Sequence, residues 1–380
     1  MEVPMPLEET LRGFYISCQQ EMFPKVEQQY GELSKWSQLL LHVFEMVRVH
    51  EFLPVPKSRK RGRPLTSRAS LARSFLAKMV LNIPTTSGLR DRLISDPVLR
   101  SLCGWPAQRT VPSASTFSRA FQEFAESELP TRIHAKLIEQ RYQEHLVGHI
   151  SRDSTAIEAR EKPVPKTQAP KPKKRKRGRP KKGGKRPKEP RRLEYQPTMS
   201  LEQMVNDLPK DCTVGCKKNA KGYTQKWIGF KFHMDAADGG VPISCAISSA
   251  SLHDSQAAIA LATMTQQRGI NCYDLMDSAY DAKEIHAHCE QLKHVAIIDP
   301  NPRNRKAEYT REQQAQRHAG FTSPQRVRYA ERSTVERAFG RLKDEVGARH
   351  VRVRGYQKVM CHLMFGVVVL AVDQLLRMIQ

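Results

Sequence analysis

Three acidic residues, far apart in a sequence of 380 residues, have side chains that could hold divalent metal ions together. Asp153 lies in the segment HISRDSTAI, Asp277 in CYDLMDSAY, and Glu336 in YAERSTVERAFGRLK. Mg²⁺ prefers carboxylate oxygens, and two ions about 3.5–4 Å apart can stabilise both the attacking and the leaving oxygen of a phosphodiester transfer. We therefore predict that these three residues are the catalytic and metal-binding residues of a site for two Mg²⁺ ions, with Mn²⁺ as a substitute.

Glu336 also belongs to a narrow polar stripe. Four polar residues fall within about 60° around a helix that advances 100° per residue, and they are Tyr329, Arg332, Glu336 and Lys343. A stripe this narrow and polar is not a core face. Arg332 and Lys343 on it would contact the phosphates of a nucleic acid, and Tyr329 would position the strand. An exposed ion pair between Arg332 and Glu336, four residues apart, is the alternative explanation.

A sheet and a following helix are needed to bring these residues together. Asp153 lies in a predicted first strand, and Asp277 ends a predicted strand at 271–279. Residues 228–234 and 241–247 alternate between apolar and polar side chains around the turn ADGG, which predicts a strand hairpin. The other predicted elements are helices at 254–267, 281–292 and 325–347 and a strand at 294–300. Strands that alternate with helices indicate a mixed α/β sheet, in which ligands gather at strand ends.

The first part of the chain and its last segment have a different pattern. Residues 10–149 are predicted to form several short helices, which fit a helix-turn-helix and a packed bundle equally well. The apolar run 363–372 has 10 residues, fewer than the ~18 of a membrane span, so we predict a buried terminal helix and no membrane partner. The amino terminus predicts no secretory signal, and the 8 cysteines lack a framework spacing. We therefore expect a cytoplasmic protein with reduced thiols.

The charge of the chain points to a polyanionic partner. Its 63 Lys and Arg against 39 Asp and Glu give a net charge of +24. Residues 162–192 hold 16 Lys and Arg and one Glu, so this tract carries +15 and the rest of the chain +9. Cationic side chains that neutralise phosphates release condensed counterions, which makes nucleic acid the first candidate and a nucleoid-associated location the expected one.

The tetrapeptide RGRP occurs twice in basic surroundings, and it resembles an AT-hook. In such a hook, glycine permits close approach to the narrow minor groove of AT-rich DNA and the arginines enter it. Generic attraction to phosphates is the alternative for both copies. The residues predicted to bind DNA in this way are Arg61 and Arg63 in the first copy and Arg177, Gly178, Arg179 and Pro180 in the second.

Several other residues with metal-binding or capping side chains are given structural roles. Cys212 and Cys216 form a lone CxxxC, whereas a structural zinc site needs four ligands. His286 and His288 are two residues apart on a predicted helix, so they point to different faces. Asp254 is predicted to cap the amino end of the helix 254–267.

The sequence resembles the bacterial insertion-sequence DDE transposases that carry the YREK signature. The spacing of that signature is reproduced by Tyr329, two residues, Arg332, three residues, Glu336, six residues and Lys343. Further similar segments include LISDPVLRSLCGW, STFSRAFQEF, KWIGFKFHMDAADGGVPISCAISSASLHDS, MDSAYD and VRVRGYQKV, so that the resemblance covers roughly residues 60–375. It implies an α/β, ribonuclease-H-like fold with a mixed five-stranded sheet and flanking helices, preceded by an all-helical domain. Asp153 would lie on the first strand, Asp277 after the fourth and Glu336 on the following helix.

The resemblance also implies a division of the chain. Residues 1–148 would form a helical domain for DNA-end binding and dimerisation, with a basic loop at 54–64. Residues 149–380 would form the catalytic domain, interrupted by a disordered, AT-hook-like insert at 162–195. Since 59 residues separate Asp277 from Glu336, the large β-strand insertion of some relatives has no room here.

The activity implied by the resemblance is DNA transposition. The chain would cleave strands at insertion-sequence ends with Mg²⁺ and transfer them into target DNA, as a homodimer on double-stranded DNA that carries terminal inverted repeats. Two rival hypotheses remain open: a non-catalytic, AT-rich DNA-binding or architectural protein derived from a transposase, and a nuclease that cuts without joining. Three separated acids in a basic protein favour the enzyme, because a binding module has no need of them.

Overall fold

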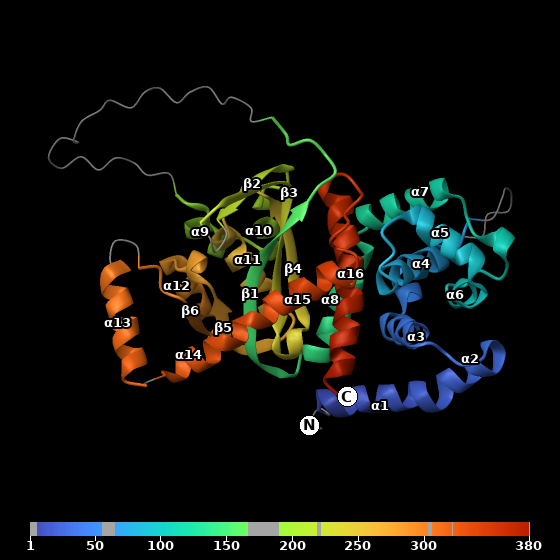
Figure 1. The fold of residues 1–380 in the computed structure, drawn as a ribbon, viewed down its shortest axis with the longest axis horizontal. Helices are drawn as coiled ribbons and strands as arrows, with labels where there is room; N and C mark the ends of the chain where they lie inside the picture. The colour runs from blue at the N-terminus through green and yellow to red at the C-terminus, as the bar shows by residue number, and fades with distance from the viewer. Residues whose placement is uncertain are drawn as a thin grey trace.

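A mixed β-sheet lies beside a region made only of helices in the computed structural model of the chain (Figure 1). The structure describes residues 6–54, 65–165, 190–218, 222–302, 306–320 and 322–379. Both RGRP segments, and with them the predicted DNA contacts of Arg61, Arg63 and Arg177 to Pro180, lie outside the described residues.

The helical region confirms the prediction of several short helices. Its α-helices are α1 (Leu7–Ser17), α2 (Phe23–Tyr30), α3 (Lys35–Val47), α4 (Arg68–Val80), α5 (Thr86–Ser95), α6 (Pro97–Leu102), α7 (Ala114–Glu126) and α8 (Leu129–Tyr142). Side-chain oxygens of Ser67, Thr85 and Asp96 accept hydrogen bonds from backbone N–H groups in the first turns of α4, α5 and α6. Each of these three helices therefore begins where its sequence satisfies an otherwise unpaired N–H donor.

The predicted mixed sheet is confirmed, and in the described part of the chain it has six strands rather than five. The strands are β1 (Leu146–Glu158), β2 (Thr213–Lys218), β3 (Thr224–Ala237), β4 (Pro242–Ser249), β5 (Ile270–Met276) and β6 (Val295–Ile298). Their order is β2-β3-β1-β5-β6, and β4 pairs with β3. β1, β5 and β6 are mutually parallel, whereas β3 is antiparallel to β1, β2 and β4.

The strand that the sequence pattern missed is β2. Its Val214 is 47% exposed, and its sequence TVGCKK lacks the buried alternation by which a half-buried strand is recognised. Asp277 consequently follows the fifth strand in chain order rather than the fourth.

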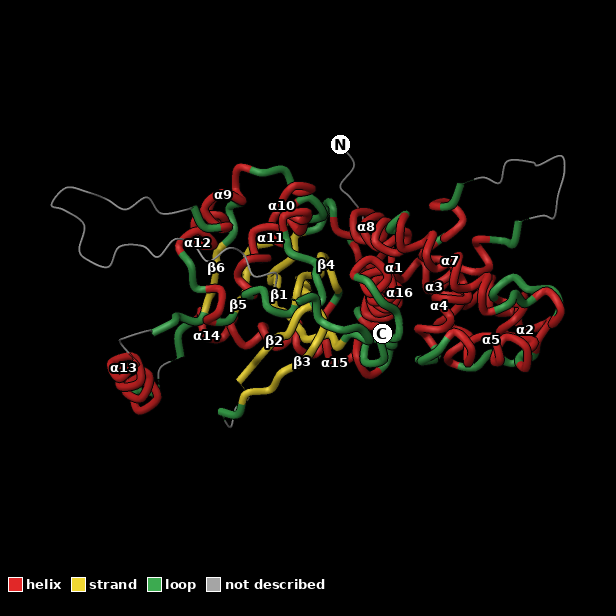
Figure 2. The backbone as a smooth tube through the Cα atoms, turned by 90° about the horizontal axis from the view of Figure 1, so that it is seen from above, coloured by secondary structure: helices red, strands yellow, loops and turns green. Residues whose placement is uncertain are grey.

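Helices cover both faces of the sheet (Figure 2). α15 (Ser333–Asp344) lies on one side, and α10 (Leu201–Asp207) and α11 (Ala258–Gln266) lie on the other. α12 (Lys283–Gln291) confirms the predicted helix at 281–292, and it packs against α11 and β6.

The last helix, α16 (Tyr356–Arg377), joins the sheet to the helical region. It packs against α3, α4, α7 and α8 as well as α15 and β4, and Phe365 contacts the rings of Phe75, Phe121 and Phe124. The predicted burial of 363–372 is confirmed. The helix has 22 residues, and its most apolar 18-residue window has a mean hydropathy of 2.0, so it could cross a membrane by length and composition, but 89% of that window is buried inside the protein.

Three expectations about the second half of the chain are corrected. The helix predicted at 325–347 is divided into α14 (Pro324–Tyr329), a 3₁₀ turn (Ala330–Arg332) and α15. The segment 301–324 contains α13 (Lys306–His318), which the sequence concealed because it is strongly polar and shows no clear apolar stripe. Part of the insert expected to be disordered at 162–195 is also helical, because α9 (Arg192–Tyr195) buries Leu193 against the sheet region.

Two buried histidines make the fold sensitive to acid. His134 Nε2 bonds to the Pro242 carbonyl oxygen at 2.9 Å, and His362 Nε2 bonds to the Gly347 carbonyl oxygen at 3.0 Å. Burial lowers the pKa of each imidazole to about 3. Between pH 6.5 and about 3 the unfolded chain therefore binds more protons than the folded one, so stability falls as the pH falls below 6.5.

We expect each of these histidines to remove about 2 kcal/mol of unfolding free energy between pH 7 and pH 5. Urea denaturation at the two pH values measures the change. His134→Gln should reduce the pH dependence by about 2 kcal/mol, whereas the same substitution at the exposed His50 should leave it unchanged. An unchanged pH dependence in His134→Gln contradicts the assignment.

Candidate active site

Asp153 lies in the middle of β1, and its neighbours place it on the side of the sheet that α15 covers. Successive side chains of a strand point to opposite faces. Arg152 therefore turns into the core under α11, whereas Asp153 reaches Arg332, whose Nη1 lies 3.4 Å from Asp153 Oδ2. The register that pairs Ser151 with Leu275 of β5 also places Asp153 beside Asp277, two residues further along each parallel strand.

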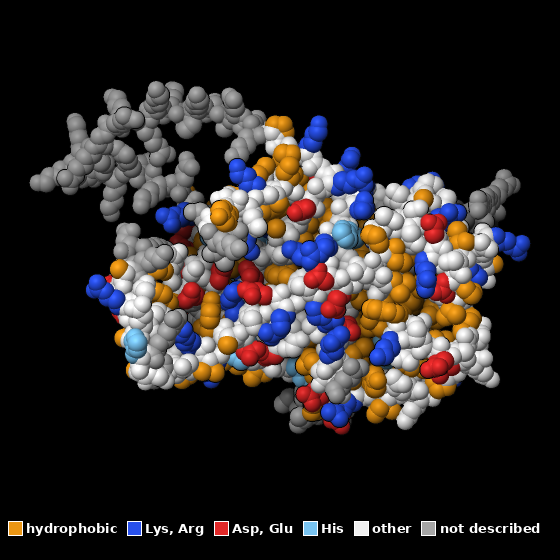
Figure 3. All heavy atoms as spheres, viewed as in Figure 1, with side chains coloured by type: hydrophobic (Ala, Val, Ile, Leu, Met, Phe, Trp, Pro, Cys, Tyr) orange, Lys and Arg blue, Asp and Glu red, His pale blue; other side chains and the backbone are white. Residues whose placement is uncertain are grey.

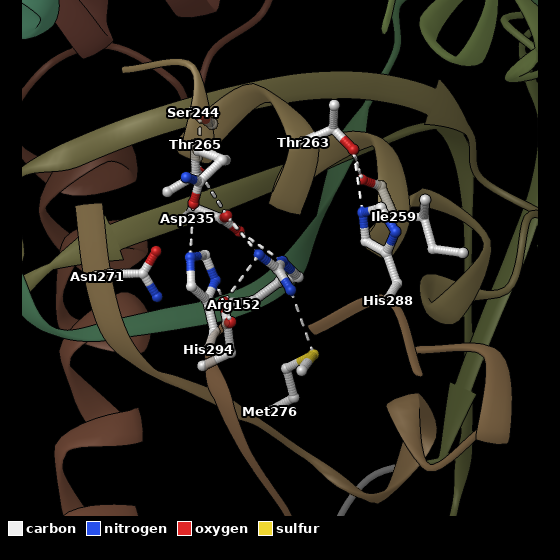
Figure 4. Close-up of polar contacts among 12 residues, drawn as sticks. Arg152, Asp235, Ser244, Ile259, Thr263, Thr265, Asn271, Met276, His288 and His294 are labelled. Carbon is white, nitrogen blue, oxygen red and sulfur yellow. Dashed lines mark hydrogen bonds and ion pairs between the residues drawn. The ribbon is translucent and has the colours of Figure 1, made fainter. Parts of the chain in front are cut away.

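A buried ion network fixes this part of β1 (Figure 4). Arg152 donates to both oxygens of Asp235 on β3, at 2.8 and 2.7 Å, and its Nη2 lies 3.3 Å from Asp274 Oδ1 on β5. His294 bonds to the other oxygen of Asp274 at 2.9 Å, and Thr265 donates to Asp235 at 2.7 Å. Burial alone would lower the pKa of Arg152, but the two aspartates outweigh it and raise that pKa. The charged cluster thus links three strands directly behind Asp153.

Asp277 follows β5, where the chain enters a 3₁₀ turn at Ser278–Tyr280. Its Oδ1 accepts a hydrogen bond from the Ala279 N–H at 2.9 Å. Burial raises the pKa of Asp277, the backbone bond and Arg332 lower it, and the nearby charge of Asp254 raises it. The net effect is a raised pKa, so the surroundings of Asp277 disfavour its ionised form.

Glu336 lies in the first turn of α15, and Arg332 connects it to Asp153. Arg332 Nη2 lies 2.5 Å from Glu336 Oε1, while Nη1 of the same guanidinium contacts Asp153. The ion pair that the spacing left open as an alternative is therefore formed, and it includes a third partner. The Tyr329 ring faces this guanidinium at 5.9 Å.

The last residue of the polar stripe, Lys343, also reaches β1. Its Nζ donates to Thr155 Oγ1 at 2.6 Å, two residues along the strand from Asp153 and on the same face. Burial lowers the pKa of Lys343, and the charges of Arg349 and Lys217 lower it further. The structure thus brings all four stripe residues to the face of the sheet that carries Asp153, although the 3₁₀ turn separates Tyr329 from α15.

The pKa of Asp153 is raised to about 6. Burial is the main cause, and the charges of Asp277 and Asp254 add to it, whereas the Ser154 N–H and Arg332 act in the opposite direction. The hydroxyl of Tyr280, fully buried near these three aspartates, has no hydrogen-bond partner among the residues that the structure describes. Carboxylates that oppose one another's ionisation are relieved by an added cation.

These residues fit a divalent metal ion by the chemistry of their donors. Asp153, Asp277 and Glu336 would supply hard carboxylate oxygens, as Mg²⁺ requires. Within the described ranges, no three His, Cys, Asp or Glu side chains stand ready to hold an ion. Arg332 lies between Asp153 and Glu336, and its guanidinium forms an ion pair with each of them.

Asp254 is a residue of this site that the sequence pattern assigned to another role. The predicted N-cap is wrong, because the cap position is His253 and the turn has no side-chain cap. Asp254 Oδ1 instead accepts hydrogen bonds from Ser154 Oγ at 2.6 Å and Lys231 Nζ at 2.9 Å. Burial alone would raise the pKa of Asp254, but these two donors outweigh it and lower that pKa.

The signal that could have identified Asp254 is its place directly after a predicted hairpin, at a strand end where ligands gather. Its partner Lys231 is a cation in the buried second half of β3. Its side chain is 14% exposed, and it also donates to the Leu252 carbonyl oxygen at 2.7 Å. Asp254 and Lys231 therefore attach the loop after β4 to β1 beside Asp153.

The weaker metal candidates are not brought together. Cys212 is buried and Cys216 is exposed, and both are free thiols. His286 contacts Asp281, whereas His288 contacts Thr263 on α11, which confirms that they point to different faces.

Comparison with protein families gave two matches. Residues 148–372 match the family described as "Transposase DDE domain", and residues 25–123 match the one described as "Transposase domain (DUF772)". Neither a search of curated proteins nor a search of solved structures found a match.

Proposed function

The chain belongs to the family of transposases with a DDE domain, since that domain spans more than half of its length, and from this we propose that it cleaves and joins DNA at one carboxylate site. The proposed reaction is Mg²⁺-dependent hydrolysis at the ends of an insertion sequence, followed by attack of the freed 3′-hydroxyl on target DNA. The proposed site consists of Asp153, Asp277 and Glu336. The observation that carries this proposal is that Arg332 contacts both Asp153 and Glu336 and lies close enough to Asp277 to lower its pKa, so that one cation faces all three carboxylates in a chain of net charge +24.

The residues of the chain would divide the work between them. When bound, Mg²⁺, or Mn²⁺ in its place, would lower the charge barrier of the phosphoryl transfer. Asp153, Asp277 and Glu336 would hold it, and the Arg152 network would keep Asp153 in register with Asp277. Arg332 and Lys343 would contact DNA phosphates, with Tyr329 beside them to position the strand.

We propose the wider organisation of the chain on the same basis. Residues 1–148 would bind the element's ends and support dimerisation, and 149–380 would catalyse the reaction. Basic segments at 54–64 and 162–195 would add contacts to the minor groove of DNA. A homodimer would place one site at each of two terminal inverted repeats, in a protein associated with the nucleoid.

Cleavage of a DNA fragment that carries the flanks of the gene tests the proposed function. Wild-type protein with Mg²⁺ should nick the fragment at the element's ends, and Glu336→Gln should not. Glu345→Gln is the matched control, because Glu345 also pairs with an arginine of α15 at its other end. Cleavage that persists in Glu336→Gln refutes the site. No cleavage by any of the proteins, with tight binding to AT-rich DNA, would favour the architectural rival.

A smaller effect is expected from the partners of Asp153. Asp254→Asn should lower the cleavage rate about 10- to 100-fold, as is usual for residues that orient metal ligands. The reason is that Lys231 and Ser154 then lose the carboxylate that fixes them beside Asp153. Single-turnover cleavage and Mn²⁺ affinity by electron paramagnetic resonance measure the two consequences.

Asp207→Asn is the control for this substitution. Asp207 is also 25% exposed and ion-paired, but it lies in α10 with Arg192 as its partner. Equal losses in the two variants, or an unchanged Mn²⁺ affinity in Asp254→Asn, would show that Asp254 has only a structural role.

A further inference from the structure

We propose that a pocket between the helical region and the segment before α16 binds a phosphate group of DNA, with Lys78 as its buried contact. The proposal rests on the proposed function, because it takes DNA to be the ligand. The pocket is separate from the carboxylate site: it is formed by α4, α5, α7, the residue Arg160 after β1, the segment 352–354 and the start of α16.

The size and walls of the pocket suit part of a nucleotide. Its volume is about 650 Å³, within the range of ligand-binding pockets. Phe75, Met79, Phe121 and Val353 supply apolar wall, against which a sugar could pack. A phosphodiester offers both a charged group and an apolar one to such a site.

Lys78 is the observation that points to an anion. It lies on α4, it is 5% exposed, and it lines the pocket. Within the described residues its ammonium group has no hydrogen bond and no ion pair. Burial lowers the pKa of Lys78 to about 8, and no carboxylate raises it. A buried ammonium group without a partner is costly, so an anion that enters the pocket would remove a cost that the folded chain already bears.

The rim of the pocket adds further positive charge. Four cationic residues line it with Lys78, and they are Arg160, Arg352, Arg354 and Lys358. None of the described lining residues is acidic. The rim is also braced, because Arg354 Nε donates to the Arg160 carbonyl oxygen at 2.9 Å and Glu161 accepts from the Gly355 N–H.

The space-filling view shows Lys and Arg side chains gathered near the upper end of α16, where it meets the helical region (Figure 3). The backbone phosphates of DNA are the polyanion that the proposed function brings to this surface. A phosphate bound to Lys78 would fix the position of the duplex on the helical region, while the carboxylate site acts at another place on the same DNA.

Lys78→Met tests the proposal, because methionine preserves the apolar stem and removes the charge. Affinity for a duplex of the gene's flanking sequence is measured without Mg²⁺, so that it does not depend on cleavage. We expect affinity to fall about 10- to 100-fold, as for a lost hydrogen bond to a charged group. The slope of log affinity against log salt should fall by about 0.9. The melting temperature should rise, since an uncompensated buried charge is removed.

Lys283→Met is the control, because Lys283 is an exposed lysine of α12 on the far side of the sheet. It should leave affinity, salt slope and melting temperature unchanged. Arg352→Gln, at the exposed rim of the pocket, should also weaken DNA binding. This second test does not depend on whether the buried methionine of Lys78→Met disturbs the fold.

Inorganic phosphate distinguishes a free anion from DNA as the ligand. Wild-type affinity for DNA in both Lys78→Met and Arg352→Gln overturns the proposal. It is equally overturned if these substitutions abolish stabilisation by inorganic phosphate and leave DNA affinity intact, because the pocket then takes free phosphate. Weakened DNA binding in both variants supports it, even if the wild-type protein fails to cleave, so the two proposals can fail separately.

Discussion

Asp153→Asn is expected to lower both DNA cleavage and the joining of a pre-cleaved end by about 10³-fold or more. A metal ligand contributes several kcal/mol to the stabilisation of transition-state charge, and about 4 kcal/mol corresponds to a factor of about 10³ in rate. The surroundings of Asp153 also oppose its charge, since burial raises its pKa to about 6. Single-turnover assays on intact ends and on ends with a free 3′-hydroxyl measure the two steps separately.

DNA affinity should remain in this variant, because the substitution removes a negative charge from a basic protein. Asp211→Asn, at an exposed position before β2, should cleave and join as the wild type does. If Asp153→Asn abolishes cleavage but joins pre-cleaved ends at the normal rate, the two steps do not share one site. If the wild type cleaves but never joins, the nuclease hypothesis is favoured.

Arg152→Met is expected to lower the free energy of unfolding by about 3–5 kcal/mol, the usual cost of removing one partner from a buried ion network. Asp235 and Asp274 are 0% and 1% exposed, and Arg152 is the cation they share. Their charges would be left buried, with Thr265 and His294 among their remaining side-chain hydrogen-bond partners. Urea denaturation at pH 7 measures the loss. The pairing of β1 with β5, which places Asp153 beside Asp277, should weaken at the same time.

Arg68→Met is the matched comparison, because Arg68 also pairs with a carboxylate far away in the sequence but at the surface. Arg68 and Glu123 are 28% and 47% exposed, so the loss there should be at most about 1 kcal/mol. Similar losses in the two variants would mean that the buried network does not hold the strands together.

Much of the fold could be predicted because its signals are local. Alternation of apolar side chains identified β3 and β4, and the apolar run at 363–372 identified the buried part of α16. Polar caps at Ser67 and Thr85 mark where helices begin. Each of these signals is confined to one element, where the period of the side chains reports which face is buried.

Other features lie outside the reach of such patterns. β2 and α13 were missed because an exposed edge strand and a strongly polar helix bury too few apolar residues to show a clear period. Asp254 was assigned to a cap because capping depends on immediate neighbours, whereas its partner Ser154 is 100 residues away.

For the candidate site, the sequence by itself determined which residue types were available: three carboxylates, a stripe of Tyr329, Arg332 and Lys343, and a strongly basic insert. The tertiary structure alone decided that Arg332 bridges Asp153 and Glu336, that Asp254 and Lys231 join them, and that Lys78 is buried without an acid. The physical reason is that a side chain's chemistry is fixed by its residue type. Its charge state, its partners and the cost of its burial depend on which strands and helices the fold places beside it.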